Sequence, residues 1–298
     1  MSGVSADVRG FRFRKLEKPE EFRQVLEVHR AVWGDEGAVP TTLQRALQDN
    51  GGLVLGAFAD IHLAGFAISL LGWDGTSLYH YSHVTAVRPE YQNHHLGLRL
   101  KTFQREEVQK LGLAEIRWTY DPLQSRNARL NVRLLGGAPD RYYIHYYGQL
   151  PDLLNRELET DRVRLRWEIA TARVEERVAG KYPSAEEDHD RWKRSVPIIE
   201  TEVGEHGLRR PTAVAEPSGE PAHLEIPFDL NSVREHDPET LRPWRHAVRD
   251  GFRAAFDANY RVDDFAVITA EHERRSFYFL SPAPKTAEGA AASGPPSV

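Results

Sequence analysis

The sequence contains no cysteine and only one methionine among its 298 residues. The lack of cysteine excludes disulfide bonds, thiolate metal ligands and cysteine nucleophiles. No stretch approaches the run of about 18 apolar residues that a membrane-spanning helix needs. Positive charge is not in excess either, because 44 acidic residues outnumber 39 basic ones and the net charge is −5. We therefore expect neither a nucleic acid nor a membrane surface as the main partner.

The composition does supply a packed core, since 40% of the residues are hydrophobic and 28% are charged. The first letters, M-S-G-V-S-A-D, contain no basic segment followed by an apolar run. We therefore expect no signal peptide and a cytoplasmic location. Residues 283–298 are of low complexity and are expected to form a disordered tail.

Apolar periodicity in the first half of the chain predicts a mixed α/β fold. The expected strands are 11–16, 53–58, 63–71, 78–87, 114–120 and 142–147, and the expected helices are 19–32, 41–48, 94–111 and 125–135. The order is strand, helix, helix, three strands, helix, strand, helix, strand. Such an order predicts a mixed sheet with helices on both faces, which we assign to a first domain over residues 1–150.

The second half has a weaker pattern, from which we predict an α+β half over residues 151–282 that packs on the first domain. Expected are a strand at 162–174, a helix at 184–194, a loop at 204–222, a strand at 224–228, a helix at 238–258 and a closing hairpin at 265–269 and 276–280.

The most informative segment is 84–97, V-T-A-V-R-P-E-Y-Q-N-H-H-L-G, which moves from a strand through a polar turn into a helix. One interpretation is that the turn and the helix start present exposed backbone N–H groups to an anion. A helix N-terminus provides unpaired donors together with the positive end of the helix dipole. The other interpretation is an ordinary polar connector that caps the helix.

This arrangement resembles the GNAT superfamily of acyl-CoA-dependent N-acyltransferases. In that family a Gln/Arg-x-x-Gly-x-Gly/Ala segment follows the strand, and its N–H groups hold the pyrophosphate of coenzyme A. The matching residues are Gln92, Asn93, His94, His95, Leu96 and Gly97, so the resemblance implies that they bind coenzyme A. His95 replaces the middle glycine, and we expect it to resist left-handed backbone geometry or to donate to a phosphate.

A narrower resemblance is carried by W-T-Y-D-P-L-Q-S-R-N-A-R-L-N-V-R-L-L-G at 118–136 and by Y-Y-G-Q-L-P-D-L-L-N-R-E-L-E-T-D-R further along. Both runs are similar to a GNAT-like subgroup associated with N-acylamino acid metabolism, including N-succinylation of amino acids. The resemblance spans roughly residues 11–168. It implies a GNAT-like acyltransferase fold with a C-terminal α+β extension and acetyl-CoA or succinyl-CoA as co-substrate.

Acyl transfer to an amine requires a base and donors for the oxyanion. His83 is the candidate base, because it lies four residues before Val87 where the family often places Glu or His, and because imidazole titrates near neutrality. The alternative is a hydrogen-bonded core histidine. His80 is expected on the opposite face of the strand. The resemblance also implies that the N–H of Ala86 or Val87 binds the thioester carbonyl.

The family's usual thiolate acid, a tyrosine in the helix after the next strand, has no counterpart, because the position falls on Val132. Either the thiolate leaves unprotonated, or a tyrosine from 142–147 replaces the missing residue.

Several polar residues in or near the helix expected at 125–135 are candidates for ligand contact. Asn127 resembles the asparagine that contacts the pantetheine arm, although asparagine also caps helices well. Asp121 follows the strand at the open end of the sheet, although Asp-Pro is a common turn starter. A stripe of arginines is either a solvated face or a clamp for a substrate carboxylate or a phosphate; it comprises Arg126, Arg129 and Arg133, with Arg162 as a weaker candidate.

The 13 histidines show no metal-binding spacing such as H-E-x-x-H, so no metal is expected. The sequence analysis therefore predicts an enzyme that moves an acetyl or succinyl group from acyl-CoA to a small amine, such as an amino acid, by direct attack. The alternative is a non-catalytic acyl-CoA-binding or sensing protein with the same fold. A homodimer is compatible with the sequence but is indicated by no particular residue.

Overall fold

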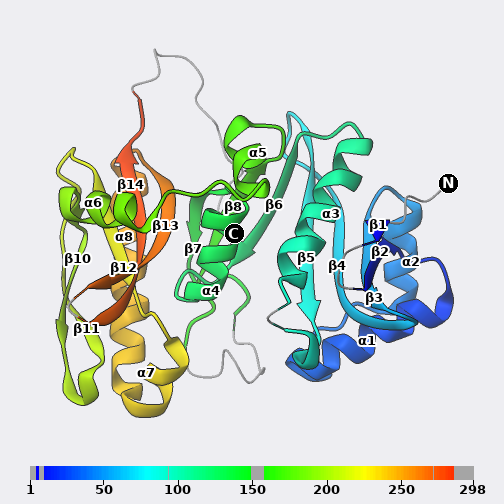
Figure 1. The fold of residues 1–298 in the computed structure, drawn as a ribbon, viewed down its shortest axis with the longest axis horizontal. Helices are drawn as coiled ribbons and strands as arrows, with labels where there is room; N and C mark the ends of the chain where they lie inside the picture. Colours follow the sequence, from blue (N-terminus) through cyan, green and yellow to red (C-terminus); the bar gives the residue numbers. More distant parts are fainter. Residues whose placement is uncertain (1–4, 7–9, 93, 149–157, 271, 285–298) are drawn as a thin grey trace.

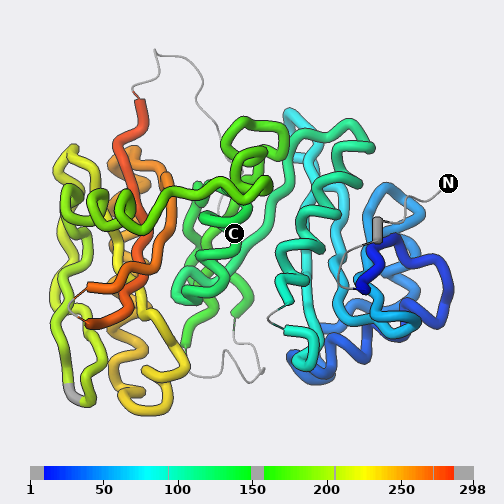
Figure 2. Tube along the Cα trace, viewed as in Figure 1, coloured from blue at the N-terminus to red at the C-terminus, as the bar shows by residue number. Residues whose placement is uncertain are grey.

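The computed structural model describes residues 5–6, 10–92, 94–148, 158–270 and 272–284, and for residues 5, 6 and 205 only the backbone. The chain runs along the long axis of the molecule, from the N-terminal strands at one end to the C-terminal sheet at the other (Figure 2). Within the described parts of the chain, no helix is long and apolar enough to cross a membrane.

The first sheet has eight strands in the order β1-β2-β3-β4-β5-β6-β8-β7 (Figure 1). Their bounds are β1 Ser5–Ala6, β2 Phe11–Lys15, β3 Leu53–Ala59, β4 His62–Trp73, β5 Leu78–Val87, β6 Glu115–Tyr120, β7 Ala138–Tyr143 and β8 Arg162–Glu168. All neighbours are antiparallel except β5 and β6, which are parallel. The prediction of a mixed α/β fold is confirmed.

Helices cover both faces of this sheet, because the strands are apolar on both sides. α1 (Pro19–Trp33) and α2 (Thr41–Asp49) lie on one face, where Phe22 and Val28 of α1 share a core cluster with Phe66 of β4. α3 (Leu96–Lys110) lies on the other face, where Leu100 packs in a second cluster with Ala67. α4 (Ser125–Ala128) contributes to this second cluster and continues into a π-helical segment, Arg129–Leu134.

The second half forms a four-stranded sheet in the order β13-β14-β12-β9 and a separate two-stranded hairpin. The strands are β9 Val196–Pro197, β12 Ala222–Ile226, β13 Tyr260–Ala270 and β14 Glu273–Pro282, with β10 Ile199–Val203 and β11 Arg209–Val214 in the hairpin. The helices are α5 Ala172–Val178, α6 Ala185–Arg194, α7 Leu230–His236 and α8 Leu241–Asp257. The closing hairpin of β13 and β14 was expected, and it is longer than predicted.

The two halves share one hydrophobic core. The same cluster contains Leu123 and Leu135 of the first half together with Trp244 and Tyr278 of the second. β8 also lies inside the first sheet, between β6 and β7. The sheet of the first half therefore includes residues beyond the expected domain boundary at 150.

Three expected elements differ from the observed ones. The strand expected at 162–174 ends at Glu168, and α5 follows. The strand expected at 142–147 is β7, which ends at Tyr143, and the chain turns at His145 with φ 50°. The expected loop 204–222 contains β11, which pairs with β10. Pro211 obscured this strand in the sequence, but proline is tolerated where a strand has a neighbour on one side only.

Candidate active site

The candidate site begins at an irregularity in β5. Ser69 of β4 pairs with Ser82, and Ile68 pairs with Val84, so His83 is an extra residue in the ladder and forms a β-bulge. Bulges bend a strand and redirect its side chains, and they are frequent beside functional sites. Here the bulge projects the His83 side chain into a cavity.

β5 and β6 separate immediately at this bulge. They are paired only at His80 with Ile116 and at Tyr81 with Arg117, although β5 continues to Val87 and β6 continues to Tyr120. A cavity of about 470 Å³ lies between the diverging strands, within the range typical of small-molecule sites. Its walls come from β5, β6, α3 and α4, and from the ends of α1 and β8.

The N-terminus of α3 borders the cavity through Gly97. The first bond of the helical ladder runs from Arg99 N–H to His95 O, and the side chain of His95 does not cap the helix. The N–H groups of the first turn, from Leu96 to Leu98, therefore have no acceptor within the helix. A Cβ added at Gly97 would meet only Leu130 Cδ2, at 3.9 Å, so this position leaves room for a ligand.

His95 adopts φ 56° and ψ 19°, which is the left-handed conformation. The expectation that histidine would resist this geometry is wrong, since the backbone bends here as it would with glycine. Gln92 is exposed and donates from Nε2 to Val87 O over 3.4 Å, and the exposed His94 ring lies 6.4 Å from that of Phe11. Asn93 lies outside the described residues.

The strand β5 offers backbone donors to the cavity. Arg88 N–H donates to Ala64 O on β4, so the alternation of an antiparallel ladder also turns the Ala86 N–H toward β4. The N–H groups of Thr85 and Val87 then point in the opposite direction, toward the side of β5 on which β6 is no longer paired with it. Val87 and Thr85 line the cavity, whereas Ala86 is buried in the core under α1. Thr85 Oγ1 is buried without a hydrogen-bond partner among the described residues.

His83 and His80 occupy different environments, as predicted, although the bulge at His83 interrupts the strand alternation on which the prediction was based. His80 is fully buried and its ring nitrogens contact Ser69 Oγ at 2.9 Å and Gly51 O at 3.0 Å, which makes it a structural histidine. His83 is exposed to solvent within the cavity. Nearby protein atoms desolvate its ring, and this desolvation, with a smaller contribution from His29, lowers the pKa of His83 below the ordinary value. The imidazole is therefore neutral at pH 7 and can accept a proton.

The cavity also contains Lys101, which sequence analysis did not identify. Lys101 is only 5% exposed, and its Nζ donates to Ser82 Oγ at 2.7 Å and lies 3.9 Å from the centre of the Trp118 ring. Burial lowers the pKa of Lys101 to about 7. A sequence signal did exist, because Lys101 follows Gly97 by four residues and so shares its helix face.

Tyr120 is a cavity-lining tyrosine, and its hydroxyl accepts a hydrogen bond from Tyr278 at 3.3 Å. Burial raises the pKa of Tyr120 above the usual value. No described residue lining the cavity comes from 142–147. Tyr142 instead donates to Asp161 at 2.9 Å, while the Tyr146 ring lies 4.8 Å from Tyr143.

Three of the other predicted ligand residues, Asn127, Arg162 and Asp121, line the cavity. Asn127 is exposed at the cavity and is not the helix cap, since α4 is preceded by Gln124 as its cap residue. Arg162 lines the cavity and donates to Asp161 O at 2.9 Å. Asp121 also lines the cavity, but both of its carboxylate oxygens accept hydrogen bonds from Arg245, each at 2.8 Å.

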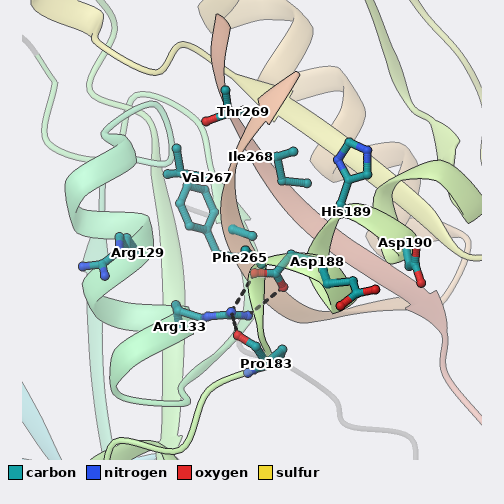
Figure 3. A pocket seen from close by; sticks show the side chains of 13 residues that line it. Arg129, Arg133, Pro183, Asp188, His189, Asp190, Phe265, Val267, Ile268 and Thr269 are labelled. Carbon is teal, nitrogen blue, oxygen red and sulfur yellow. Dashed lines mark hydrogen bonds and ion pairs between the residues drawn. The ribbon is translucent and has the colours of Figure 1, made fainter. Parts of the chain in front are cut away.

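The expected arginine stripe does not form a common clamp. Arg126 is exposed and is not among the residues lining this cavity. Arg129 and Arg133 instead border another pocket of about 580 Å³, between the π-helical segment, α6 and β13 (Figure 3). Arg133 is buried there and donates to Asp188 at 3.0 and 2.7 Å and to Asp264 at 2.9 Å. The buried charge of this pocket is thus paired within the protein.

Within the described residues, no group of three or more histidine and carboxylate side chains could hold a metal ion. Chemically, the cavity between β5 and β6 brings together a neutral imidazole, a buried amine, strand N–H groups and an open helix N-terminus.

No known protein family matches the sequence, and no curated protein matches it. Several solved structures are similar in fold. The ribosomal-protein-S18-alanine N-acetyltransferase of Escherichia coli is 18% identical, with 58% of this chain and 96% of that chain covered and a TM-score of 0.43. The NatC complex bound to Gag peptide and CoA is 15% identical over 53% and 98%, with a TM-score of 0.44. A GNAT-family acetyltransferase of Streptococcus pneumoniae is 16% identical over 52% and 97%, with a TM-score of 0.43. The similarity to GNAT-fold acetyltransferases thus extends over about half of this chain.

Proposed function

We propose that this protein is an acyl-CoA-dependent N-acyltransferase whose active site is the cavity between β5 and β6. The observation that carries the proposal is the separation of the two strands at the His83 bulge, directly beside the open N-terminus of α3. This arrangement supplies a base, donors for a carbonyl and donors for an anion within one cavity. Acyl transfer from a thioester to an amine requires the base and the carbonyl donors, and the anion donors can hold the pyrophosphate of coenzyme A.

The residues present fit coenzyme A. The first-turn N–H groups of α3 can bind the pyrophosphate, because a helix N-terminus attracts anions, and the missing side chain at Gly97 permits a close approach. Asn127 can bond an amide of the pantetheine arm. The N–H of Val87 and the unpartnered Oγ1 of Thr85 can donate to the thioester carbonyl, because both residues line the cavity.

In the proposed mechanism the acceptor amine attacks the thioester carbon directly while both substrates are bound. A C–N bond forms, and the negative charge that develops on the carbonyl oxygen is held by the Val87 N–H. His83 takes the proton that the amine loses. The C–S bond then breaks and its electron pair leaves with sulfur. No covalent enzyme intermediate is involved.

We propose an acetyl or succinyl donor and a small amine acceptor such as an amino acid. Arg162 supports this acceptor class, because a guanidinium at the cavity wall can pair with an α-carboxylate. Asp121 is already paired with Arg245. We therefore assign it a structural role in the cavity wall and not a role in binding the acceptor.

The test is release of free coenzyme A thiol from acetyl-CoA and from succinyl-CoA across a panel of amino acids, with binding of each acyl-CoA measured separately by calorimetry. Binding with turnover supports the enzyme. Binding without turnover on any amine would favour the non-catalytic acyl-CoA sensor, and failure to bind coenzyme A would refute both.

A further inference from the structure

Lys101 lies where β5 and β6 begin to diverge. The last paired residues are Tyr81 and Arg117, and the residues that follow them, Ser82 and Trp118, are the two that Lys101 contacts from α3. The ammonium group is thus held where the two strands begin to diverge, one helical turn beyond Gly97.

The groups in contact with Lys101 are uncharged. Besides Ser82 Oγ and the Trp118 ring, Nζ lies 3.5 Å from Gln104 Oε1. A buried ammonium without a carboxylate partner is costly, and such groups are concentrated at functional sites. Methionine would fill the same space without this cost, so the fold itself does not require the charge.

The proposed mechanism has so far assigned no proton donor to the coenzyme A thiolate that departs. Tyr120 is a poor proton donor, because burial raises its pKa and the hydrogen bond that it accepts from Tyr278 offsets this effect only in part. An ammonium with a pKa near 7 is a stronger acid than an ordinary thiol, whose pKa is about 8.5. Proton transfer from Lys101 to the thiolate is therefore favourable.

We propose that Lys101 donates the proton that the departing thiolate accepts, an assignment that rests on the proposed function. As the C–S bond breaks, its electron pair goes to sulfur, and sulfur takes a proton from the Lys101 ammonium, which becomes a neutral amine. His83 holds the proton lost by the acceptor. Transfer of one proton from His83 to Lys101 through solvent restores both groups. For an acceptor that binds as the neutral amine the cycle is proton-neutral, and an acceptor that arrives as an ammonium releases its additional proton to solvent before attack.

No other titratable group that lines the cavity is as well suited to protonate the thiolate as Lys101. His83 on β5 is the base, Tyr120 on β6 titrates above the working range, and Asp121 at the end of β6 is paired with Arg245. Arg162 of β8 is assigned to the carboxylate of the acceptor. The pH profile of kcat is therefore expected to have an acid limb from His83 and an alkaline limb from Lys101.

The test compares Lys101→Met with Lys110→Met, a control that removes a charge from the exposed end of the same helix. In Lys101→Met we expect kcat to fall about 100-fold or more, with KM for acyl-CoA changed only a few-fold and the alkaline limb lost. Lys110→Met should behave as the native protein. Unchanged kcat with an unchanged alkaline limb in Lys101→Met would overturn the proposal.

A second readout needs no turnover. In the complex with free coenzyme A, ultraviolet absorbance of the thiolate reports ionisation of the bound thiol. Lys101 is charged near and below pH 7, and a neighbouring ammonium favours the thiolate. At these pH values the native complex should therefore contain more thiolate than the Lys101→Met complex. Equal thiolate absorbance near pH 7 would remove the role of Lys101 while leaving the acyltransferase proposal intact. Failure of the native protein to bind coenzyme A would remove both.

Discussion

Both carboxylate oxygens of Asp121 accept hydrogen bonds from Arg245, each at 2.8 Å, across a separation of 124 residues. Burial opposes ionisation of Asp121, but Arg245 outweighs this effect and lowers its pKa. Because Arg245 is only 1% exposed and belongs to α8, the pair attaches the end of β6, and hence one wall of the candidate site, to the second half.

This pair predicts a large loss of stability when one partner is removed. Arg245→Met should lower the free energy of unfolding by about 3–5 kcal/mol, because it leaves a buried carboxylate uncompensated. The double change Asp121→Leu with Arg245→Met should cost less than Arg245→Met alone. Denaturant unfolding measures both, and a double variant that is the least stable of the set would contradict the prediction.

Replacement of His83 should affect chemistry rather than binding. In the proposed mechanism His83→Ala lowers kcat about 10²- to 10⁴-fold and leaves acyl-CoA affinity nearly unchanged. His62→Ala is the matched control, because His62 is exposed and lies outside the cavity lining. Steady-state kinetics and calorimetry separate the two effects, and full activity of His83→Ala would exclude its role as base.

The pH dependence follows from the lowered pKa of His83. A base acts when it is neutral, so kcat should rise as pH increases through the folded-state pKa, which lies below about 6.5. The midpoint of the acid limb should therefore lie below pH 6.5. A profile of kcat against pH checks this, and an acid limb centred above pH 7 would contradict the assignment.

Gly97→Ala should separate stability from binding. The new Cβ meets only Leu130 Cδ2 at 3.9 Å, and alanine loses less conformational entropy than glycine in a helix. The free energy of unfolding should thus rise by about 0.5–1 kcal/mol. Coenzyme A affinity should persist in Gly97→Ala, because the GNAT pattern allows alanine at this position. It should fall in Gly97→Leu, whose larger side chain occupies the approach to the first-turn N–H groups. Thermal unfolding with and without coenzyme A tests both variants, and unaltered affinity in Gly97→Leu would argue against phosphate binding at this turn.

Lys101 also predicts how stability depends on pH. Its folded-state pKa of about 7 lies below the unfolded value of 10.5, so between these values the unfolded state binds more protons and stability rises with pH. Relative to Lys101→Met, the native protein should gain about 2 kcal/mol between pH 7 and pH 9. Parallel stability curves for the two proteins would show that the amine is not desolvated.

Local patterns in the sequence predicted most of the first half. β5 begins and ends at the expected residues, and α3 differs from its expected bounds by two residues or fewer at each end. The polar turn before α3 was also identified from its order of residues. Pairings were less predictable: β8 enters the first sheet between β6 and β7, although β7 precedes it in the chain. Strand order depends on contacts that no local period encodes.

By itself, the sequence determined where strands and helices form, that cysteine chemistry is absent, and that Gly97 opens a helix beside His83. These properties are local, because periodicity, helix ends and residue chemistry need only neighbours along the chain. Only the tertiary structure decided that β5 and β6 diverge at a bulge, that Asp121 is held by Arg245, and that Lys101 loses its water between Ser82 and Trp118. Strand register, ion pairing and desolvation arise from groups distant in sequence, and they set the chemistry of the cavity.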